Sequence, residues 1–249
     1  MMRNNESIHT RTRNTTVNRI LTVLFILEPV LAFSCATKKP ETSMEKASKT
    51  PPMQVTWNID NLSTIGGYPV TVEGQPKIID TPKGKAVEFD GIDDGLFINV
   101  HPLEGAETFT LEVIFCPYAN GPEEQRFFHL QENDSNNRLL IETRIIGGTK
   151  WSLDTFMMSG KTDQTLLDKS ITHLTDQWYN VALVFDGKEM RHYINGVREL
   201  FAPIAEFMPP KAGRTSMGVR INKVYWFRGA IRQARFTRRA LEPEKFLKP

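Results

Sequence analysis

The residues of this chain that could do chemistry lie on short segments in which apolar and polar residues alternate. Those with the most useful side chains are Glu112, His129, Glu142, Arg144, Trp151 and Asp154. Because Glu142 and Arg144 are two residues apart, an extended chain places both on one face. Carboxylates and arginine hydrogen-bond hydroxyl groups, and an indole ring stacks on apolar ring faces. The same residue types also form ion pairs between strands, so ligand binding and sheet stabilisation are both open.

Two further polar residues flank an apolar one near the end of the chain. Arg220 and Asn222 stand on either side of Ile221 and would face away from it in an extended segment. They either extend the surface that carries Glu142 or end a loop.

Three carboxylates cluster after a short apolar segment. Asp90, Asp93 and Asp94 supply the hard oxygen ligands that Ca²⁺ prefers, although their spacing is not that of an EF-hand. The alternative is a turn of solvated acids. His173 and His192 are not expected to bind a metal, because neither has a Cys or His partner at metal-ligand spacing.

The elements that must position these residues are predicted to be β-strands. Apolar runs are short, alternate with period two, and are separated by Gly, Pro, Asn and Asp, which indicates antiparallel strands in a sandwich or barrel. Asp186-Gly187 and Asn195-Gly196 predict two hairpins in tandem. Strands are expected at residues 54–58, 69–72, 77–79, 86–89, 96–100, 109–116, 126–131, 138–144, 151–157, 178–185, 189–194, 216–221, 223–227 and 230–236. A short helix is expected at residues 241–247.

The beginning of the chain differs from the rest. Four arginines precede an apolar run at residues 20–27, and small residues lead into Cys35, as in a secretory signal peptide over residues 1–35. The run is far shorter than the roughly 20 residues of a membrane-spanning helix. The segment resembles the lipobox of bacterial lipoproteins, which implies that Cys35 is acylated and holds the protein at the cell envelope, at the outer membrane or periplasmic face. An ordinary secreted protein cut near Ser34 and an uncleaved anchor are the alternatives.

Composition supports one domain after a polar tether at residues 36–52. The chain has 249 residues, of which 40% are apolar, enough for a substantial core over residues 53–249. Its net charge of +2 belongs to the signal segment, so the mature protein is close to neutral and no nucleic-acid partner is expected. If Cys35 is acylated, Cys116 has no intramolecular disulfide partner.

Five motifs in order carry a resemblance to a known fold: KAVEFDGIDDGLFI, FTLEVIF, DQWYNVALVFDG, HYINGV and FRGAIRQARFTRRALEPEKF. Together they resemble the laminin-G-like jelly rolls of the concanavalin A-like lectin and glucanase superfamily. The resemblance implies an all-β sandwich of two antiparallel sheets. Several such domains carry calcium at a sheet rim, and none of the five motifs identifies a ligand.

The leading hypothesis is a surface-tethered accessory module that binds a polysaccharide and reaches a membrane only through its N-terminal lipid. A glycoside hydrolase or polysaccharide lyase is the second hypothesis, with Glu112, Glu142 and Asp154 as the available acids. A module that adheres to another protein is the third. The sequence predicts no cofactor other than possible Ca²⁺ and no oligomeric state.

Overall fold

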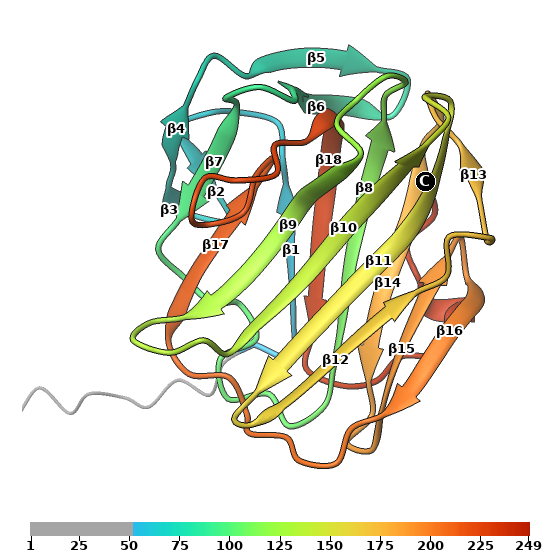
Figure 1. Cartoon of the computed structure of the whole chain (residues 1–249). Helices are drawn as coiled ribbons and strands as arrows, with labels where there is room; N and C mark the ends of the chain where they lie inside the picture. The colour runs from blue at the N-terminus through green and yellow to red at the C-terminus, as the bar shows by residue number, and fades with distance from the viewer. Residues whose placement is uncertain (1–51) are drawn as a thin grey trace, which may run out of the picture. The chain divides into compact units, whose positions relative to one another are not determined.

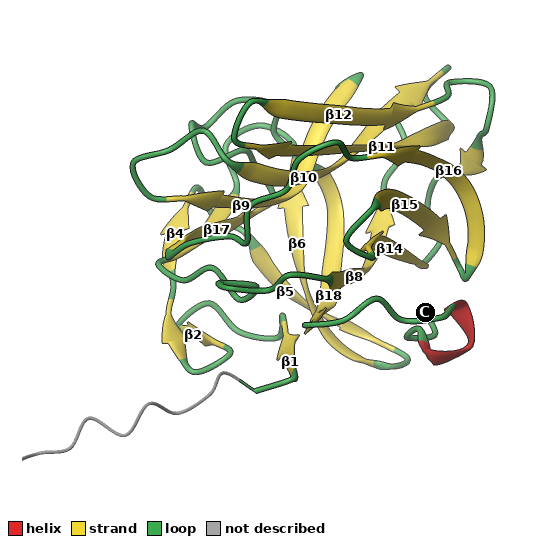
Figure 2. Ribbon diagram, turned by 90° about the horizontal axis from the view of Figure 1, so that it is seen from below, coloured by secondary structure: helices red, strands yellow, loops and turns green. Residues whose placement is uncertain are grey.

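The computed structural model describes residues 52–249, so the signal segment, Cys35 and nearly all of the predicted tether lie outside the described residues. Nearly all regular structure in this part is β-strand, arranged as two antiparallel sheets packed face to face (Figures 1 and 2). No helix among the described residues is long and apolar enough to cross a membrane. The predicted all-β, two-sheet sandwich is confirmed.

The sheet nearer the viewer in Figure 1 is called the front sheet. Its strands, in spatial order, are β12 (Thr162–Leu167), β11 (Lys150–Ser159), β10 (Arg138–Ile146), β9 (Glu124–Glu132), β17 (Gly213–Met217), β7 (Gly95–Ile98) and β4 (Thr71–Glu73). A short strand, β13 (His173–Leu174), pairs with β11.

The second sheet is called the back sheet. Its order is β16 (Val197–Pro203), β15 (Glu189–Ile194), β14 (Tyr179–Phe185), β8 (Phe109–Pro117), β18 (Arg228–Thr237), β6 (Gly84–Asp90) and β5 (Lys77–Thr81), with β1 (Gln54–Asn58) also paired to β18. A small hairpin joins β2 (Thr64–Ile65) to β3 (Tyr68–Pro69). The two predicted tandem hairpins are confirmed as β14–β15 and β15–β16.

Aromatic side chains fill the space between the sheets. Phe115 of β8 stacks on Phe127 of β9, with ring centroids 4.1 Å apart and planes 7° from parallel. Trp151 and Phe227 pack against the Phe115 ring as well. Each such side chain contributes about 1.5–3 kcal/mol by leaving water. Cys116 is also buried, and burial raises the pKa of its thiol to about 12.

The outer face of the back sheet is covered by the C-terminal segment. Leu241 and Phe246 pack with Val184 and Tyr193, and the Leu241 N–H donates to the Thr110 hydroxyl at 2.9 Å. Figure 2 shows this segment running along the outside of the back sheet. The helix expected at residues 241–247 is wrong: only Pro243–Lys245 forms a 3-10 turn. Extended backbone on both sides of the turn lets the two apolar side chains reach the sheet.

Two adjacent glycines give a matched test of how β1 is held. Both have positive φ, but a Cβ on Gly66 would lie 2.1 Å from Trp57 Nε1, whereas a Cβ on Gly67 would meet nothing within 4 Å. Each alanine variant should lose about 1–2 kcal/mol from the left-handed backbone. Gly66→Ala should lose about 1–3 kcal/mol more, because the buried indole must move. Urea unfolding would measure both variants, and equal losses would show that Trp57 does not limit this turn.

Candidate functional site

The alternation of side chains decides which residues leave the core on the front sheet. In β10, Leu139, Ile141 and Ile145 face the core, so Glu142 and Arg144 face outward. In β11, the core side is taken by Trp151, Leu153 and Met157, so Asp154 and Phe156 face outward. Glu142, Arg144 and Asp154 therefore share the outer face, as the sequence predicted for the first two.

A bulge in β9 brings one more charged residue to this face. Ile141 is paired with Phe128, but the next residue, Glu142, is paired with Arg126, so Phe127 has no partner across β10. Both phenylalanines face the core. The extra residue reverses the alternation, so Arg126 points outward beside Glu142.

Five residues form an ion-pair network on the outer face: Glu124, Arg126, Glu142, Arg144 and Asp154. Arg126 Nε lies 3.1 Å from Glu142 Oε2, and Arg144 Nη2 lies 3.3 Å from the same oxygen. Arg144 also contacts the Asp154 carboxylate and reaches Glu124 Oε2 at 2.9 Å. The side chains of Glu142 and Asp154 are only 3% and 2% exposed. The two acids are thus held in fixed positions by arginines.

Burial governs the protonation of this network. Burial and the nearby charge of Asp154 together raise the pKa of Glu142 to about 7, against the lowering effect of Arg126 and Arg144. Burial likewise raises the pKa of Asp154, which Arg144 opposes. Glu142 is therefore partly protonated near neutral pH.

A loop over residues 218–227 folds against β9 at the edge of the network. The Ile221 N–H donates to His129 Nδ1 at 3.0 Å, and the Arg126 N–H donates to the Tyr225 carbonyl at 2.9 Å. The Arg126 guanidinium lies 3.5 Å from the centroid of the Tyr225 ring. Arg220 and the exposed Asn222 flank Ile221 in this loop, so both alternatives for them, an extension of the polar surface or the end of a loop, stay open.

The strand expected at residues 223–227 is wrong. Lys223 and Tyr225 have φ of 60° and 64°, a left-handed backbone that does not continue a strand. The Lys223 N–H donates to the Arg220 carbonyl at 2.7 Å and closes a turn instead. The strand expected at residues 216–221 ends at Met217, the last residue of β17.

Two predicted ligand residues are corrected by their positions. Trp151 is 0% exposed, and its ring packs in the core against Phe115 and Tyr179, with both centroid distances 5.2 Å. Glu112 is buried on the outer face of the back sheet, where it binds Arg235 and accepts the Leu247 N–H at 2.6 Å. Neither side chain offers a surface to a ligand on the front sheet.

Other residues join the face that the sequence-based prediction did not include: Arg126, Arg138, Phe156 and Tyr225. Arg138 lies four residues before Glu142 on β10, so the period of two could have found it. Its guanidinium carbon lies 4.6 Å from the centroid of the Phe156 ring. Tyr225 is 42% exposed and comes from an irregular loop, for which the sequence pattern carries no signal.

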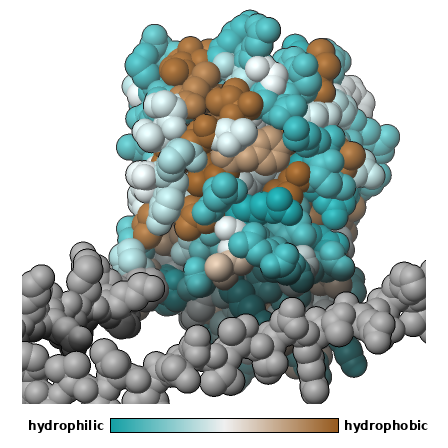
Figure 3. All heavy atoms as spheres, turned by 90° about the vertical axis from the view of Figure 1, so that its left-hand side faces the viewer, coloured by the Kyte–Doolittle hydropathy of each residue, from teal (hydrophilic) through white to brown (hydrophobic). Residues whose placement is uncertain are grey.

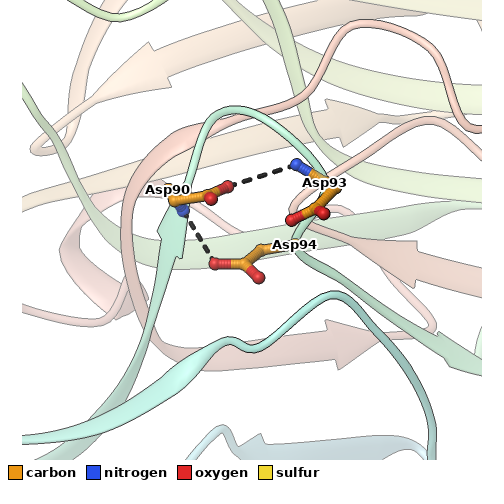
Figure 4. Close-up of side chains that lie close together, drawn as sticks. All are labelled: Asp90, Asp93 and Asp94. Carbon is orange, nitrogen blue, oxygen red and sulfur yellow. Dashed lines mark hydrogen bonds between the residues drawn. The ribbon is translucent and has the colours of Figure 1, made fainter.

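The predicted metal residues come together in the loop after β6 (Figure 4). One oxygen from each of Asp90, Asp93 and Asp94 lies within 4.8 Å of the others. Asp94 accepts N–H groups of Asp90 and Gln75 at 3.0 and 2.6 Å, and Asp90 accepts the Asp93 N–H at 3.2 Å. Oxygens at this separation fit a cation that binds ligands at about 2.3–2.6 Å, as Ca²⁺ does. The same hydrogen bonds also hold the turn without an ion.

Replacement of Glu142 should change the pH dependence of stability. Its pKa rises from an ordinary value near 4.5 to about 7 on folding, so the folded state keeps a proton that the unfolded state has released. This contribution to the free energy of unfolding is complete below pH 4.5 and is lost as pH rises to about 7. It amounts to at most about 3 kcal/mol. Glu142→Gln should flatten the decline between pH 5 and 7.5 in chemical denaturation, and an unchanged slope would contradict a raised pKa.

Solved structures similar to the domain share its fold at low identity. Domain 4 of AbnA, a GH43 extracellular arabinanase from Geobacillus stearothermophilus in complex with arabinotriose, is 18% identical with a TM-score of 0.57. The match covers 77% of this chain and 94% of that one. The receptor binding domain of botulinum neurotoxin C/D mosaic serotype is 14% identical, with a TM-score of 0.57 and coverage of 77% and 49%. The chain thus spans about half of the toxin domain, and these likenesses show the fold alone.

A third similar structure is the binding domain of botulinum neurotoxin DC in complex with SialylT, at 15% identity and a TM-score of 0.55, covering 77% of this chain and 49% of that one. No curated protein matches the sequence. The model of the Laminin_G_3 family, described as the concanavalin A-like lectin/glucanases superfamily, matches residues 90–245. The chain therefore belongs to this family, and its sandwich is a concanavalin A-like jelly roll.

Proposed function

We propose that the domain binds a polysaccharide on the outer face of the front sheet. The observation that carries the proposal is the difference between the two outer faces. The C-terminal segment covers the back sheet with Leu241 and Phe246. On the front sheet, the ion-pair network reaches the surface through Glu124, which is 43% exposed, and through the edges of its two arginines, which are 12% and 10% exposed. Fixed hydrogen-bonding groups lose little conformational freedom when a ligand binds.

Two aromatic rings supply the stacking surface that was expected from Trp151. Phe156 and Tyr225 stand on opposite sides of the ion-pair network, one on β11 and one on the loop at residues 218–227. Each is covered on one side by an arginine, Arg138 or Arg126. Sugar rings stack on such faces through their C–H groups, while charged groups hydrogen-bond their hydroxyls. The arabinotriose complex of AbnA domain 4 supports a sugar ligand for this fold.

We further propose that the chain is exported and tethered to a bacterial cell envelope by a lipid on Cys35, with the polar residues 36–52 as a spacer. The support is the order of basic, apolar and small residues that ends at Cys35. Such an arrangement would make the domain an accessory module that holds a polysaccharide near the cell. Calcium bound by Asp90, Asp93 and Asp94 would stiffen the loop after β6.

A hydrolase is the second candidate, favoured by one observation. Glu142 and Asp154 are directly opposite each other on β10 and β11, and Arg144 bridges their carboxylates. Retaining glycosidases use two carboxyls about 5–5.5 Å apart, one of which carries a raised pKa. The near-complete burial of both acids disfavours contact with a scissile bond.

One observation favours protein adhesion as a third candidate function. Apolar side chains gather on the side of the domain that carries β3 and β4 (Figure 3), where Tyr68 and Val72 are 42% and 38% exposed. Ile92, in the loop after β6, is 71% exposed. Such a surface can bind a protein, but it lacks the fixed polar groups of the front sheet.

Removal of either aromatic ring should weaken glycan binding. Phe156→Ala and Tyr225→Ala should each weaken retention on a polysaccharide array about tenfold, because each ring loses about 1–1.5 kcal/mol of stacking. Phe201→Ala and Tyr68→Ala are matched controls, with exposed rings of the same types elsewhere, and should bind like the wild type. If the controls lose binding and the front-sheet variants keep it, the site lies elsewhere.

The same array separates binding from catalysis. A binding module should release no reducing ends or unsaturated uronates from any polysaccharide. Release that disappears in Glu142→Gln would establish the hydrolase instead.

Acylation of Cys35 predicts the mass of the mature N-terminus. Mass spectrometry of protein expressed in a bacterial host should find a lipid on Cys35 and no residues before it. Cys35→Ala should leave the membrane fraction, while Cys116→Ala should remain there because Cys116 is buried in β8. An unmodified N-terminus at another residue would reject the anchor.

A further inference from the structure

Four arginines lie close enough to one buried histidine of the front sheet for their charges to lower its pKa: Arg126, Arg138, Arg214 and Arg220. His129 of β9 is paired with Leu140 of β10 and with Ser216 of β17. Arg138 and Arg214 lie two residues from these partners, so they are diagonal neighbours of His129 on the same face. The strand pairing therefore places Arg138 and Arg214 on the same face as His129, and the Arg138 guanidinium lies over Phe156 of β11.

The histidine at the centre does not balance these charges. Its Nδ1 accepts the Ile221 N–H, which places the ring proton on Nε2. Nε2 is buried and has no hydrogen-bond partner among the described residues. Burial and the charge of Arg220 are the main reasons that the pKa of His129 stays well below its ordinary value. The imidazole is a neutral donor under a positively charged surface.

Three of the four arginines lack an acidic partner. Arg126 pairs with Glu124 and Glu142, but no ion pair within residues 52–249 involves Arg138, Arg214 or Arg220, here called the arginine cluster. Arg138 donates instead to the Asn136 carbonyl at 2.8 Å. Burial and the charge of Arg220 lower the pKa of Arg138, while Asp163 and Glu142 oppose this effect, so Arg138 and Arg220 act on each other as like charges. An anion between them would relieve this repulsion.

We propose that the arginine cluster binds the anionic group of an acidic polysaccharide, a carboxylate or a sulfate ester. The inference rests on the proposed function and narrows its ligand from glycans in general to acidic glycans. Guanidinium forks bind both groups through paired N–H donors. Phe156, next to Arg138, supplies the face on which the adjoining sugar ring stacks. The ion-pair network beside the cluster holds Arg126, whereas the arginines of the cluster form no ion pair among residues 52–249.

A nucleic acid is the other common polyanion. Binding of that class depends on many phosphate contacts and on an extended basic surface. The chain carries a net charge of only +2, and the arginine cluster comprises three residues. An acidic polysaccharide with one anionic group per ring fits this local arrangement better.

The test compares polymers that differ only in charge, with the full chain at an ionic strength of about 0.15 M. Polygalacturonate and its fully methyl-esterified form supply or remove a carboxylate, and dextran sulfate and dextran supply or remove a sulfate. The chain should bind at least one acidic polymer about tenfold more tightly than its neutral counterpart. Preference for one acidic polymer over the other identifies carboxylate or sulfate as the source.

Three variants test whether the arginine cluster is what binds the acidic polymer. Arg138→Gln and Arg220→Gln should each weaken binding of the acidic polymer about tenfold, and Arg220 lies on a surface loop where substitution spares the sheet. Arg239→Gln removes an equal charge after β18 and should bind like the wild type. Melting temperatures confirm that each variant is folded.

Other outcomes overturn the inference in distinguishable ways. Equal binding of charged and neutral polymers would reject the acidic ligand while leaving glycan binding intact. Binding to no polysaccharide would reject both proposals. Tighter binding to a single-stranded oligonucleotide, lost in Arg138→Gln, would assign the cluster to nucleic acid instead.

Discussion

The stack between Phe115 and Phe127 is the contact on which the arrangement of this domain depends. It joins β8, in the middle of the back sheet, to β9, in the middle of the front sheet. Phe127 is also the extra residue of the β9 bulge. The packing that holds the sheets together thus turns Arg126 outward beside Glu142, and the polar face follows from the apolar core.

The ion-pair network on that face is better suited to hold its side chains in position than to stabilise the fold. Removing charges from water costs several kcal/mol per ion, and pairing in the protein often only offsets the loss. Here three acids share two arginines, and the cost appears as the raised pKa of Glu142. A chain selected for stability alone would do as well with apolar residues at Glu142 and Asp154. The presence of two acids held in place on an outer face is consistent with a role in hydrogen-bonding a ligand there.

Much of the fold could be predicted because strand alternation and Asp-Gly or Asn-Gly turns are local signals. The common face of Glu142 and Arg144 followed from the same alternation. Trp151 should have been excluded by it, since Trp151 and Asp154 are three positions apart and therefore face opposite sides of the strand. Glu112 could not be excluded, because a local pattern does not say to which sheet a strand belongs. The place of Arg126 depends on a bulge, which reverses the alternation without a sequence signal.

The two outer faces show why a ligand is expected on only one of them. Each carries a buried glutamate paired with an arginine, Glu112 with Arg235 on the back sheet and Glu142 with Arg144 on the front. On the back sheet the chain itself completes the pair, since Leu247 donates its N–H to Glu112. On the front sheet Glu142 is paired with Arg126 and Arg144, and an oxygen of the neighbouring Asp154 has no hydrogen-bond partner among the described residues. The back sheet is a surface that has been closed by its own C-terminus, and a bound polysaccharide would complete the front sheet in the same way.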